Sequence, residues 1–245
     1  MSMSVPTFCI KLEPDMKAIR RPLFGVIAAL LTVSASLAHA DIRITEVAPW
    51  SSGNSPVGAD WFELTNTGTS AVTISGWKVD DSSSSFAAAL ALRGVSSIAA
   101  GQSVIFIEGK ADGSTDAALK ASFITNWFGA SAPVGLQIGN YGGSAIGLST
   151  SGDAVNIYDA SGALQANVTF AISDGASPYQ TFDNAAGLNN AVISQLSVVG
   201  LKGAFVAKND FAEIGSPAAI PEPESYALML AGLGLIGAIA RKRQR

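Results

Sequence analysis

Cysteine and histidine are almost absent from this sequence of 245 residues, which contains one Cys and one His. Both of them, Cys9 and His39, lie within the first 40 residues. A chain that begins after residue 40 therefore has no thiol nucleophile, no disulfide, no imidazole base and no His/Cys zinc site. Its stability depends on an apolar core, and about 175 residues are enough to build one.

Charged residues are also scarce, at 14% of the chain, and they are unevenly distributed. Residues 41–219 contain fifteen Asp and Glu but only seven Lys and Arg, a net charge of −8. An acidic body repels phosphate backbones, so nucleic acid is excluded as a partner. The 25 Gly and 10 Pro favour many short strands and turns over long helices.

The N-terminal region has the three parts of a secretory signal. A positive segment at 16–21 is followed by an apolar run at 23–37 and then by Ala38-His39-Ala40. Small residues at positions −3 and −1 are what signal peptidase requires. The pattern predicts a signal peptide within residues 1–40, with Ala38 and Ala40 forming the signal peptidase site.

The first residues of the chain fit this signal poorly. Glu13 and Asp15 are negative where the first part of a signal peptide should be positive, so we expect translation to start at Met16. A membrane span is the alternative, but it would need about 20 apolar residues and does not explain the small residues at 38 and 40. We therefore expect the mature protein to begin at Asp41.

A second apolar run, residues 226–240, lies near the C-terminus and precedes a basic cluster formed by Arg241, Lys242, Arg243 and Arg245. As a helix it would be about 22 Å long, which is short against a hydrocarbon core of about 30 Å. Basic residues beside a span stay in the cytoplasm. The pattern predicts a single short transmembrane helix in the inner membrane, with the basic cluster as its cytoplasmic anchor and the body of the protein on the far side.

The tripeptide Pro221-Glu222-Pro223 stands just before this run. Two prolines fix φ and remove backbone donors, so the segment is expected to be extended. The order of tripeptide, short span and terminal basic cluster resembles the PEP-CTERM sorting signal of Gram-negative bacteria. The resemblance implies that an exosortase, a membrane-embedded cysteine transpeptidase, recognises Pro221, Glu222 and Pro223 and removes the tail. It also implies export, transient anchoring, and a final location at the cell surface or outside the cell.

Short β-type runs alternate with turn clusters through the body of the chain. Residues 42–47, 71–79 and 153–159 alternate apolar and polar side chains, which predicts half-buried strands, while 103–108 is nearly continuous and predicts a buried strand. The intervening clusters are rich in Gly, Ser, Asp and Asn, which favour turns. Residues 116–129 are expected to hold one short helix. This spacing favours an antiparallel sandwich or barrel.

Five motifs in this body occur in a recognisable order: ITEVAP, DWFELTNTG, SGWKVDD, IAAGQSVIFIEG and LSTSGDAVNIYDASGAL. Together they resemble the lamin tail domain over residues 44–170. The resemblance implies an all-β fold, an immunoglobulin-like antiparallel β-sandwich of the kind found in nuclear lamins and in many secreted bacterial proteins.

We place the sandwich at residues 41–217 and the sorting signal at 218–245. Residues 213–218 (EIGSPA) are expected to supply the closing strand. Residues 173–191 depart from a compact member of the family, so the resemblance leaves the C-terminal boundary of the sandwich open.

Several aromatic residues have expected roles in this fold. Trp77 falls on the same face as Val79 and should fill the space between the sheets, whereas Asn66 and Gly68 suit a turn.

Alternation along one strand places Phe62 and Leu64 on one face and Trp61 and Glu63 on the other. An alternative is that Trp50 and Trp61 form an exposed pair that stacks on sugar rings.

Acidic side chains offer the only plausible chemistry. Three groups were weighed as oxygen ligands for calcium, but none matches an EF-hand loop: Glu46, Asp60 and Glu63; Asp80 and Asp81; Asp112 and Asp116. Solvated turns are the simpler interpretation of these groups. Hydrolysis of glycosides would need two carboxylates facing each other across a cleft. We expect no cofactor, no metal and no enzyme activity.

The sequence thus predicts an exported, non-catalytic surface or matrix protein. Its expected processing partners are signal peptidase and an exosortase, and its expected ligands are exopolysaccharide or envelope proteins. A calcium-dependent adhesive or carbohydrate-binding module is the alternative, followed by a carboxylate-based hydrolase.

Overall fold

The computed structural model describes residues 41–49, 57–129, 131–143, 146–173 and 177–219. Two five-stranded sheets dominate these residues. The first sheet has the order β12 (Phe182–Asp183), β1 (Ile42–Ala48), β2 (Trp61–Asn66), β7 (Ser103–Gly109), β8 (Gln137–Gly142). The second has the order β13 (Ala191–Ile193), β10 (Leu164–Phe170), β9 (Asp153–Tyr158), β4 (Lys78–Asp80), β5 (Leu90–Ala91).

Two smaller sheets and one helix complete the described fold. The smaller sheets pair β3 (Val72–Thr73) with β6 (Ser97–Ile98), and β15 (Glu213–Gly215) with both β11 (Tyr179–Gln180) and β14 (Phe205–Val206). The helix α1 (Asp116–Phe128) ends at Gly129, which has φ of +67°. Glycine adopts this left-handed conformation without a steric penalty. The prediction of one short helix at 116–129 is confirmed.

The main core lies between the two large sheets. Phe62 and Leu64 of β2 point into it, as do Trp77 and Val79 from the other side. All four side chains are buried, which confirms the expected face of β2 and the expected role of Trp77. The strands predicted from 42–47, 103–108 and 153–159 are present as β1, β7 and β9, and the buried character of β7 is confirmed.

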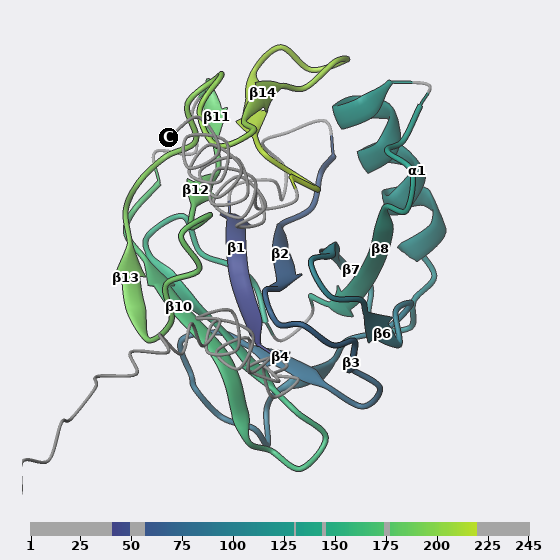
Figure 1. Ribbon diagram of the computed structural model, residues 1–245, viewed down its shortest axis with the longest axis vertical. Coiled ribbons are helices and arrows are strands. Elements are labelled where there is room, and N and C mark those ends of the chain that lie inside the picture. The colour runs from purple at the N-terminus through teal and green to yellow at the C-terminus, as the bar shows by residue number, and fades with distance from the viewer. Residues whose placement is uncertain (1–40, 50–56, 130, 144–145, 174–176, 220–245) are drawn as a thin grey trace, which may run out of the picture. The chain divides into compact units, whose positions relative to one another are not determined.

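A third layer covers the other face of the first sheet. Trp61 of β2 meets α1 there, with its ring edge-on to Phe123 at 5.3 Å and to Trp127 at 5.7 Å between centroids. Phe205 of β14 comes from the C-terminal part of the chain, and its ring lies edge-on to that of Trp127, with 5.7 Å between the centroids. In Figure 1, β1, β2, β7 and β8 run side by side, with α1 beyond β8 and β11 and β14 at one end. Helix and C-terminal segment therefore share one face of the first sheet.

Four details of the predicted fold are wrong. Strands β1 and β9 are almost wholly buried instead of half-buried. Residues 71–79 do not form one strand, because Gly76 at φ +79° turns the chain between β3 and β4 and the Trp77 N–H bonds the carbonyl of Ile74 at 3.1 Å. The sheets are not wholly antiparallel, since the pairs β7–β8, β10–β13 and β11–β15 are parallel. Finally, β15 lies in the small outer sheet instead of closing the sandwich.

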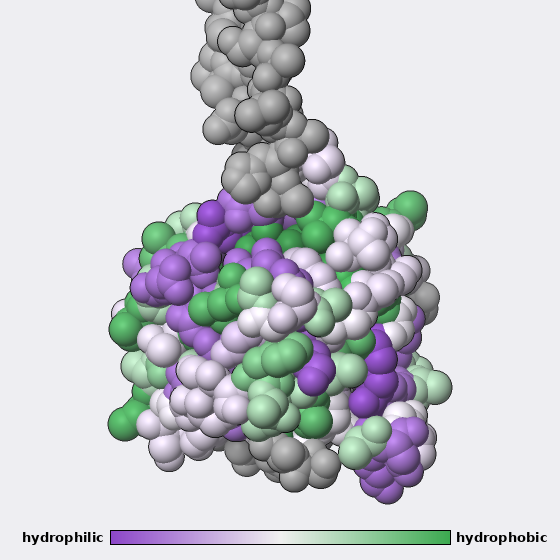
Figure 2. All heavy atoms as spheres, turned by 90° about the horizontal axis from the view of Figure 1, so that it is seen from below, coloured by the Kyte–Doolittle hydropathy of each residue, from purple (hydrophilic) through white to green (hydrophobic). Residues whose placement is uncertain are grey.

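The exposed surface is of mixed polarity. On the face shown in Figure 2, apolar residues in green lie between white and purple ones. Such interspersed apolar side chains are normal for a protein surface in water.

Candidate functional site

Two glutamates lie side by side on the outer face of the first sheet. Glu46 of β1 and Glu63 of β2 are cross-strand partners, and a β-bulge between Ile44 and Glu46 turns both Thr45 and Glu46 toward that face. Glu46 is fully buried and Glu63 is 2% exposed. The structure therefore brings together Glu46 and Glu63, two of the three acidic residues that the sequence grouped. Both side chains are buried and not exposed to solvent.

The C-terminal end of the described chain covers this pair. We call residues 216–219 the exit strap, because they lead from β15 toward the tripeptide Pro221-Glu222-Pro223. The Ser216 N–H donates to Glu46 Oε1 at 2.6 Å, and the Ala218 N–H donates to Glu63 Oε2 at 2.6 Å. The Ser103 hydroxyl in β7 donates to the Ala219 carbonyl at 3.3 Å. The exit strap therefore crosses β1, β2 and β7 in turn.

Hydroxyl groups donate to Oε1 of each carboxylate, whereas Glu46 Oε2 is buried without a hydrogen-bond partner among the described residues. Thr45 donates to Glu63 Oε1 at 2.6 Å and is linked through Thr65 to Ser103 by contacts of 2.8 and 2.7 Å. Thr181 donates to Glu46 Oε1 and contacts Ser197 at 2.7 Å. An unpaired atom in a buried polar network is costly. Thr181 and Ser197 come from outside the motifs that the sequence analysis used, whereas the other three hydroxyls come from inside them.

Burial raises the pKa of both carboxyl groups. The pKa of Glu46 rises to about 8, first because burial penalises the charged form and second because the Glu63 carboxylate is close. The pKa of Glu63 rises to about 7 through burial, although the hydrogen bonds from Thr45 and the Ala218 N–H oppose the rise. Both groups therefore bind protons more tightly in the folded than in the unfolded chain.

This predicts that the folded domain loses stability as the pH rises from 5 to 8. Below the ordinary glutamate pKa of 4.5 both states are protonated, and the contribution of the pair is fully present. Above it the unfolded chain releases protons that the folded chain keeps, until Glu63 and Glu46 ionise near 7 and 8. In this window each group lowers the free energy of unfolding by up to about 1.4 kcal/mol per pH unit. Urea unfolding of residues 41–219 at pH 5 to 8 measures the slope.

A variant carrying Glu46→Gln and Glu63→Gln should flatten most of this slope, because an amide does not ionise. Asp159→Asn is the matched control. Asp159 is exposed and its pKa is lowered, chiefly by the Ser161 hydroxyl, so it is already ionised throughout the window. Equal unfolding midpoints for the parent domain at pH 5 and pH 8 would show that the pair is not protonated in the fold.

The third member of the acidic group, Asp60, is buried but acts elsewhere. It raises the pKa of Tyr141, where burial is the larger cause and the Asp60 charge the next. Its carbonyl accepts the Glu108 N–H at 2.8 Å.

The other proposed calcium ligands hold turns and an ion pair. Asp80 Oδ2 accepts the Ser85 N–H at 2.6 Å and the Ser83 hydroxyl at 2.8 Å, while Asp81 Oδ1 accepts the Ser83 N–H at 2.8 Å. These bonds fold the serine-rich turn that follows β4. Side-chain oxygens of this kind commonly stabilise turns.

Asp112 and Asp116 lie at the start of α1. Asp112 Oδ1 accepts the Ser114 N–H at 2.9 Å, and Asp116 receives two hydrogen bonds from the Arg93 guanidinium, at 2.6 and 2.8 Å. Across the described ranges, no three His, Cys, Asp or Glu side chains gather closely enough to hold a metal ion. The calcium interpretation gains no support from these residues.

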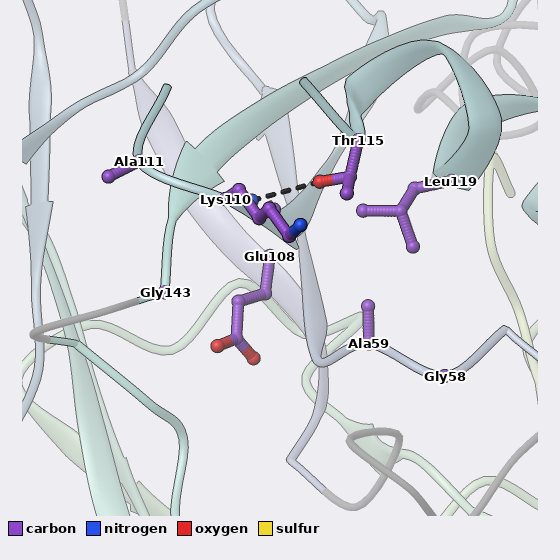
Figure 3. Close-up of a pocket in the computed structure, with 9 residues that line it drawn as sticks. Gly58, Ala59, Glu108, Lys110, Ala111, Thr115, Leu119 and Gly143 are labelled. Carbon is purple, nitrogen blue, oxygen red and sulfur yellow. Dashed lines mark hydrogen bonds between the residues drawn. The ribbon is translucent and has the colours of Figure 1, made fainter. Parts of the chain in front are cut away.

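One hollow of about 380 Å³ opens beside the end of β7 and the start of α1. Figure 3 shows Glu108, Lys110, Thr115 and Leu119 around it, with the Lys110 N–H bonded to the Thr115 hydroxyl at 2.9 Å. A Cβ at Gly143 would lie 1.8 Å from the Glu108 carboxylate, so a larger residue there would require the Glu108 side chain to move. No aromatic ring belongs to the described lining, so the hollow lacks a stacking platform for sugars.

The proposed pair of exposed aromatic residues is wrong for Trp61. Its side chain is fully buried between the first sheet and α1, because the outer face of that sheet is covered. Trp50 lies outside the described residues.

The predicted processing sites also lie outside the described residues. These are Ala38 and Ala40, the tripeptide Pro221-Glu222-Pro223, the span at 226–240, and the basic residues Arg241, Lys242, Arg243 and Arg245. In the part of the chain that the structure describes, no helix has the length and apolar character needed to cross a bilayer. The boundaries at 1–40, 41–217 and 218–245 stay predictions.

Comparison with known families supports the two resemblances. Residues 35–171, more than half of the 245-residue chain, match the family model of the Lamin Tail Domain. The chain belongs to the lamin tail domain family, whose fold is an immunoglobulin-like β-sandwich. Residues 219–244 match the PEP-CTERM protein-sorting motif, which implies an exported protein that an exosortase processes. No curated protein matches the sequence.

The sequence analysis missed the role of the segment beyond the family match. Thr181, Ser197, Ser216 and Ala218 all lie after residue 171, and they supply hydrogen bonds around the buried glutamates. The signal in this region is the segment EIGSPA at 213–218, which predicts a strand that closes the sandwich.

Proposed function

We propose that this protein is delivered to the cell surface or the extracellular matrix by its sorting signal, and that its sandwich serves there as a non-catalytic binding or structural module. The observation that carries the proposal is the match of residues 219–244 to the PEP-CTERM motif, directly after a folded lamin tail domain. Secretion signals at both ends of the sequence are consistent with this route.

The non-catalytic role is supported by how the acidic residues are used. The carboxylates of Glu46 and Glu63 are buried beneath the exit strap, and three of their four oxygens accept bonds from Ser216, Ala218, Thr45 and Thr181. A glycoside hydrolase needs its two carboxylates on opposite sides of an open cleft. Glu46 and Glu63 line no such opening among the described residues.

The proposed ligands are exopolysaccharide or proteins of the envelope. An acidic body with scattered apolar side chains favours neutral or cationic partners over anionic ones. Signal peptidase and the exosortase are its proposed processing partners, and the inner membrane is its transient anchor through residues 226–240.

Fractionation of cells with and without the sorting enzyme tests this proposal. With the enzyme, we expect the sandwich in the surface and extracellular fractions without its tail. Without the enzyme, the full-length exported form should remain in the inner membrane, because the span and the basic cluster hold it there. The same distribution in both strains would contradict delivery by the sorting signal.

A further inference from the structure

The domain holds the chain firmly at the point where the sorting signal begins. Glu46, Glu63 and Ser103 belong to three neighbouring strands, and each binds a backbone atom of the exit strap. Gly203 packs against its end, since a Cβ built there would lie 3.0 Å from the Cβ of Ala219. Ala219 is therefore held on the outer face of the first sheet.

Chain length limits how far the sorting motif can lie from this face. Pro221 follows Ala219 by two residues, which span at most about 7 Å when fully extended. The predicted span begins at residue 226, seven residues after Ala219, so the membrane boundary lies within about 25 Å of the same point. The motif must be recognised in this narrow space while the tail is in the membrane.

A peptide that is bound in an extended form usually pairs along its backbone with the groove that holds it. The backbone hydrogen bonds between such a peptide and its groove also involve the residues that flank the recognised side chains. With the exit strap docked, the N–H groups of Ser216 and Ala218 already bind Glu46 and Glu63, and the sheet covers one side of the chain. Only Ile220 then separates the exit strap from the motif.

We propose that the exit strap controls removal of the tail, and that the sorting enzyme engages the motif fully only after the strap leaves Glu46, Glu63 and Ser103. This inference rests on the proposed function, because it assumes that the motif is processed. Glu46, Glu63 and Ser103 are then positioning residues, which act through the strap and not on the reacting atoms.

Two features favour opening of the exit strap. Ala218 has φ of +61°, a left-handed conformation that is unfavourable for a residue with a Cβ. Opening also exposes Glu46 and Glu63 to water, where they ionise at neutral pH, so rising pH favours the open form.

The charges around the pair do not offset this effect. Asp183 is the cross-strand neighbour of Glu46 on β12 and is itself bound to Lys202 at 2.7 Å. Glu213 is buried on β15, two residues before Gly215 and therefore on the same face of that strand. Among the ion pairs of the described residues, none includes Glu46 or Glu63.

The test compares two placements of one Gly/Ser spacer in the full-length chain. About six residues inserted between Ala219 and Ile220 add a mean reach of about 13 Å between strap and motif. The same spacer between Glu224 and Ser225 lengthens the tether to the membrane equally but leaves the motif close to the strap. In membranes that contain the sorting enzyme, the first spacer should raise the rate of tail removal at least about fivefold. The reason is that the enzyme can then engage the motif in most chains, and not only in the small fraction whose exit strap is open. The second should not raise it.

A pH profile separates positioning from mere structural support. The measured quantity is the rate of tail removal of the parent chain divided by that of the Ala219 spacer chain. Because the same enzyme cuts both chains, its own pH dependence cancels in this ratio. We expect this ratio to rise from pH 6 to pH 8 for the parent, and to stay flat when Glu46→Gln and Glu63→Gln are introduced into both chains. Melting curves of the variants confirm that each domain remains folded.

Three results would overturn the inference. The first is an Ala219 spacer chain that is processed no faster than the parent, and the second is an equal increase from both spacers, which would assign control to the distance from the membrane. The third is a rate ratio that does not change with pH in the parent. A parent chain that is not processed at all would instead overturn the proposed function, and this inference with it.

Discussion

A domain shortened to residues 41–171 is expected to lose its cooperative fold, although it contains almost the whole family match. The segment removed, residues 172–219, contributes Phe182 and Ile193 to the core between the sheets. It also contributes Ala207 to the core beneath α1, with Tyr179 and Phe205 packed against it. Both hydrophobic cores would be opened by the same truncation.

The truncation also leaves the buried glutamates without several partners. Glu46 loses Thr181 and the Ser216 N–H, and Glu63 loses the Ala218 N–H. The larger cost comes from the core, because losing a buried side chain such as Phe182 or Ile193 costs about 2 to 5 kcal/mol. Because a domain is stabilised by only about 5 to 15 kcal/mol in total, the combined loss exceeds what the fold can tolerate.

Urea unfolding followed by tryptophan fluorescence checks this prediction, with residues 41–219 as the reference. A single substitution gives a graded version of the test. Phe182→Ala should lower the free energy of unfolding by about 3 to 5 kcal/mol, because Phe182 is buried with its ring 5.4 Å from that of Phe170. Phe211→Ala is the matched control, since Phe211 is 84% exposed and its loss should change stability by less than about 0.5 kcal/mol.

A shortened domain that unfolds cooperatively, with the same midpoint as residues 41–219, would contradict the account. It would mean that the segment after residue 171 is an accessory to a complete sandwich. The family match alone would then mark the true end of the domain.

Patterns within one strand or helix were enough to predict much of the fold. The continuous apolar character of β7 and the helical segment ending at Gly129 follow from local composition, and both are present. The split between β3 and β4 was not predicted, because the run 71–79 keeps a strand-like alternation across Gly76. One left-handed glycine is sufficient to end a strand without changing its hydrophobic pattern.

The glutamate pair shows why the site was harder to predict than the strands. Strict alternation along β1 puts Glu46 on the same face as Ile44 and puts Val47 on the opposite face. The bulge reverses this, so Val47 enters the main core and Glu46 joins Glu63 on the outer face. A bulge depends on the pairing of two strands, which the pattern of one strand does not reveal.

The cover over the pair depends on contacts that are still more distant in the chain. Ser216 and Glu46 are 170 residues apart, and Ala218 and Glu63 are 155 apart. Nothing in the local sequence of either glutamate distinguishes a carboxylate held by a distant backbone N–H from one in a solvated turn. The sequence therefore grouped Glu46 with Glu63 correctly but Asp60 wrongly, and the preferred interpretation as solvated turns is wrong for the buried pair.

Replacement of Glu222 by Ala tests the central claim, that the tail is a sorting signal, most directly. The signal peptide and the apolar run are unchanged by this substitution, so export and anchoring should continue. Removal of the tail should stop, because the middle residue of the recognised tripeptide is lost. Glu224→Ala, one residue beyond the tripeptide, is the matched control and should be processed like the parent.

A single gel of the three chains, in a host that has the sorting enzyme, gives the answer. We expect the parent and Glu224→Ala to lose about 2 to 3 kDa, the mass of about 20 to 25 residues in a chain of 25.0 kDa, and Glu222→Ala to accumulate uncut in the inner membrane. Equal processing of the parent and Glu222→Ala would contradict the account, because an ordinary C-terminal anchor does not depend on the residues that precede it.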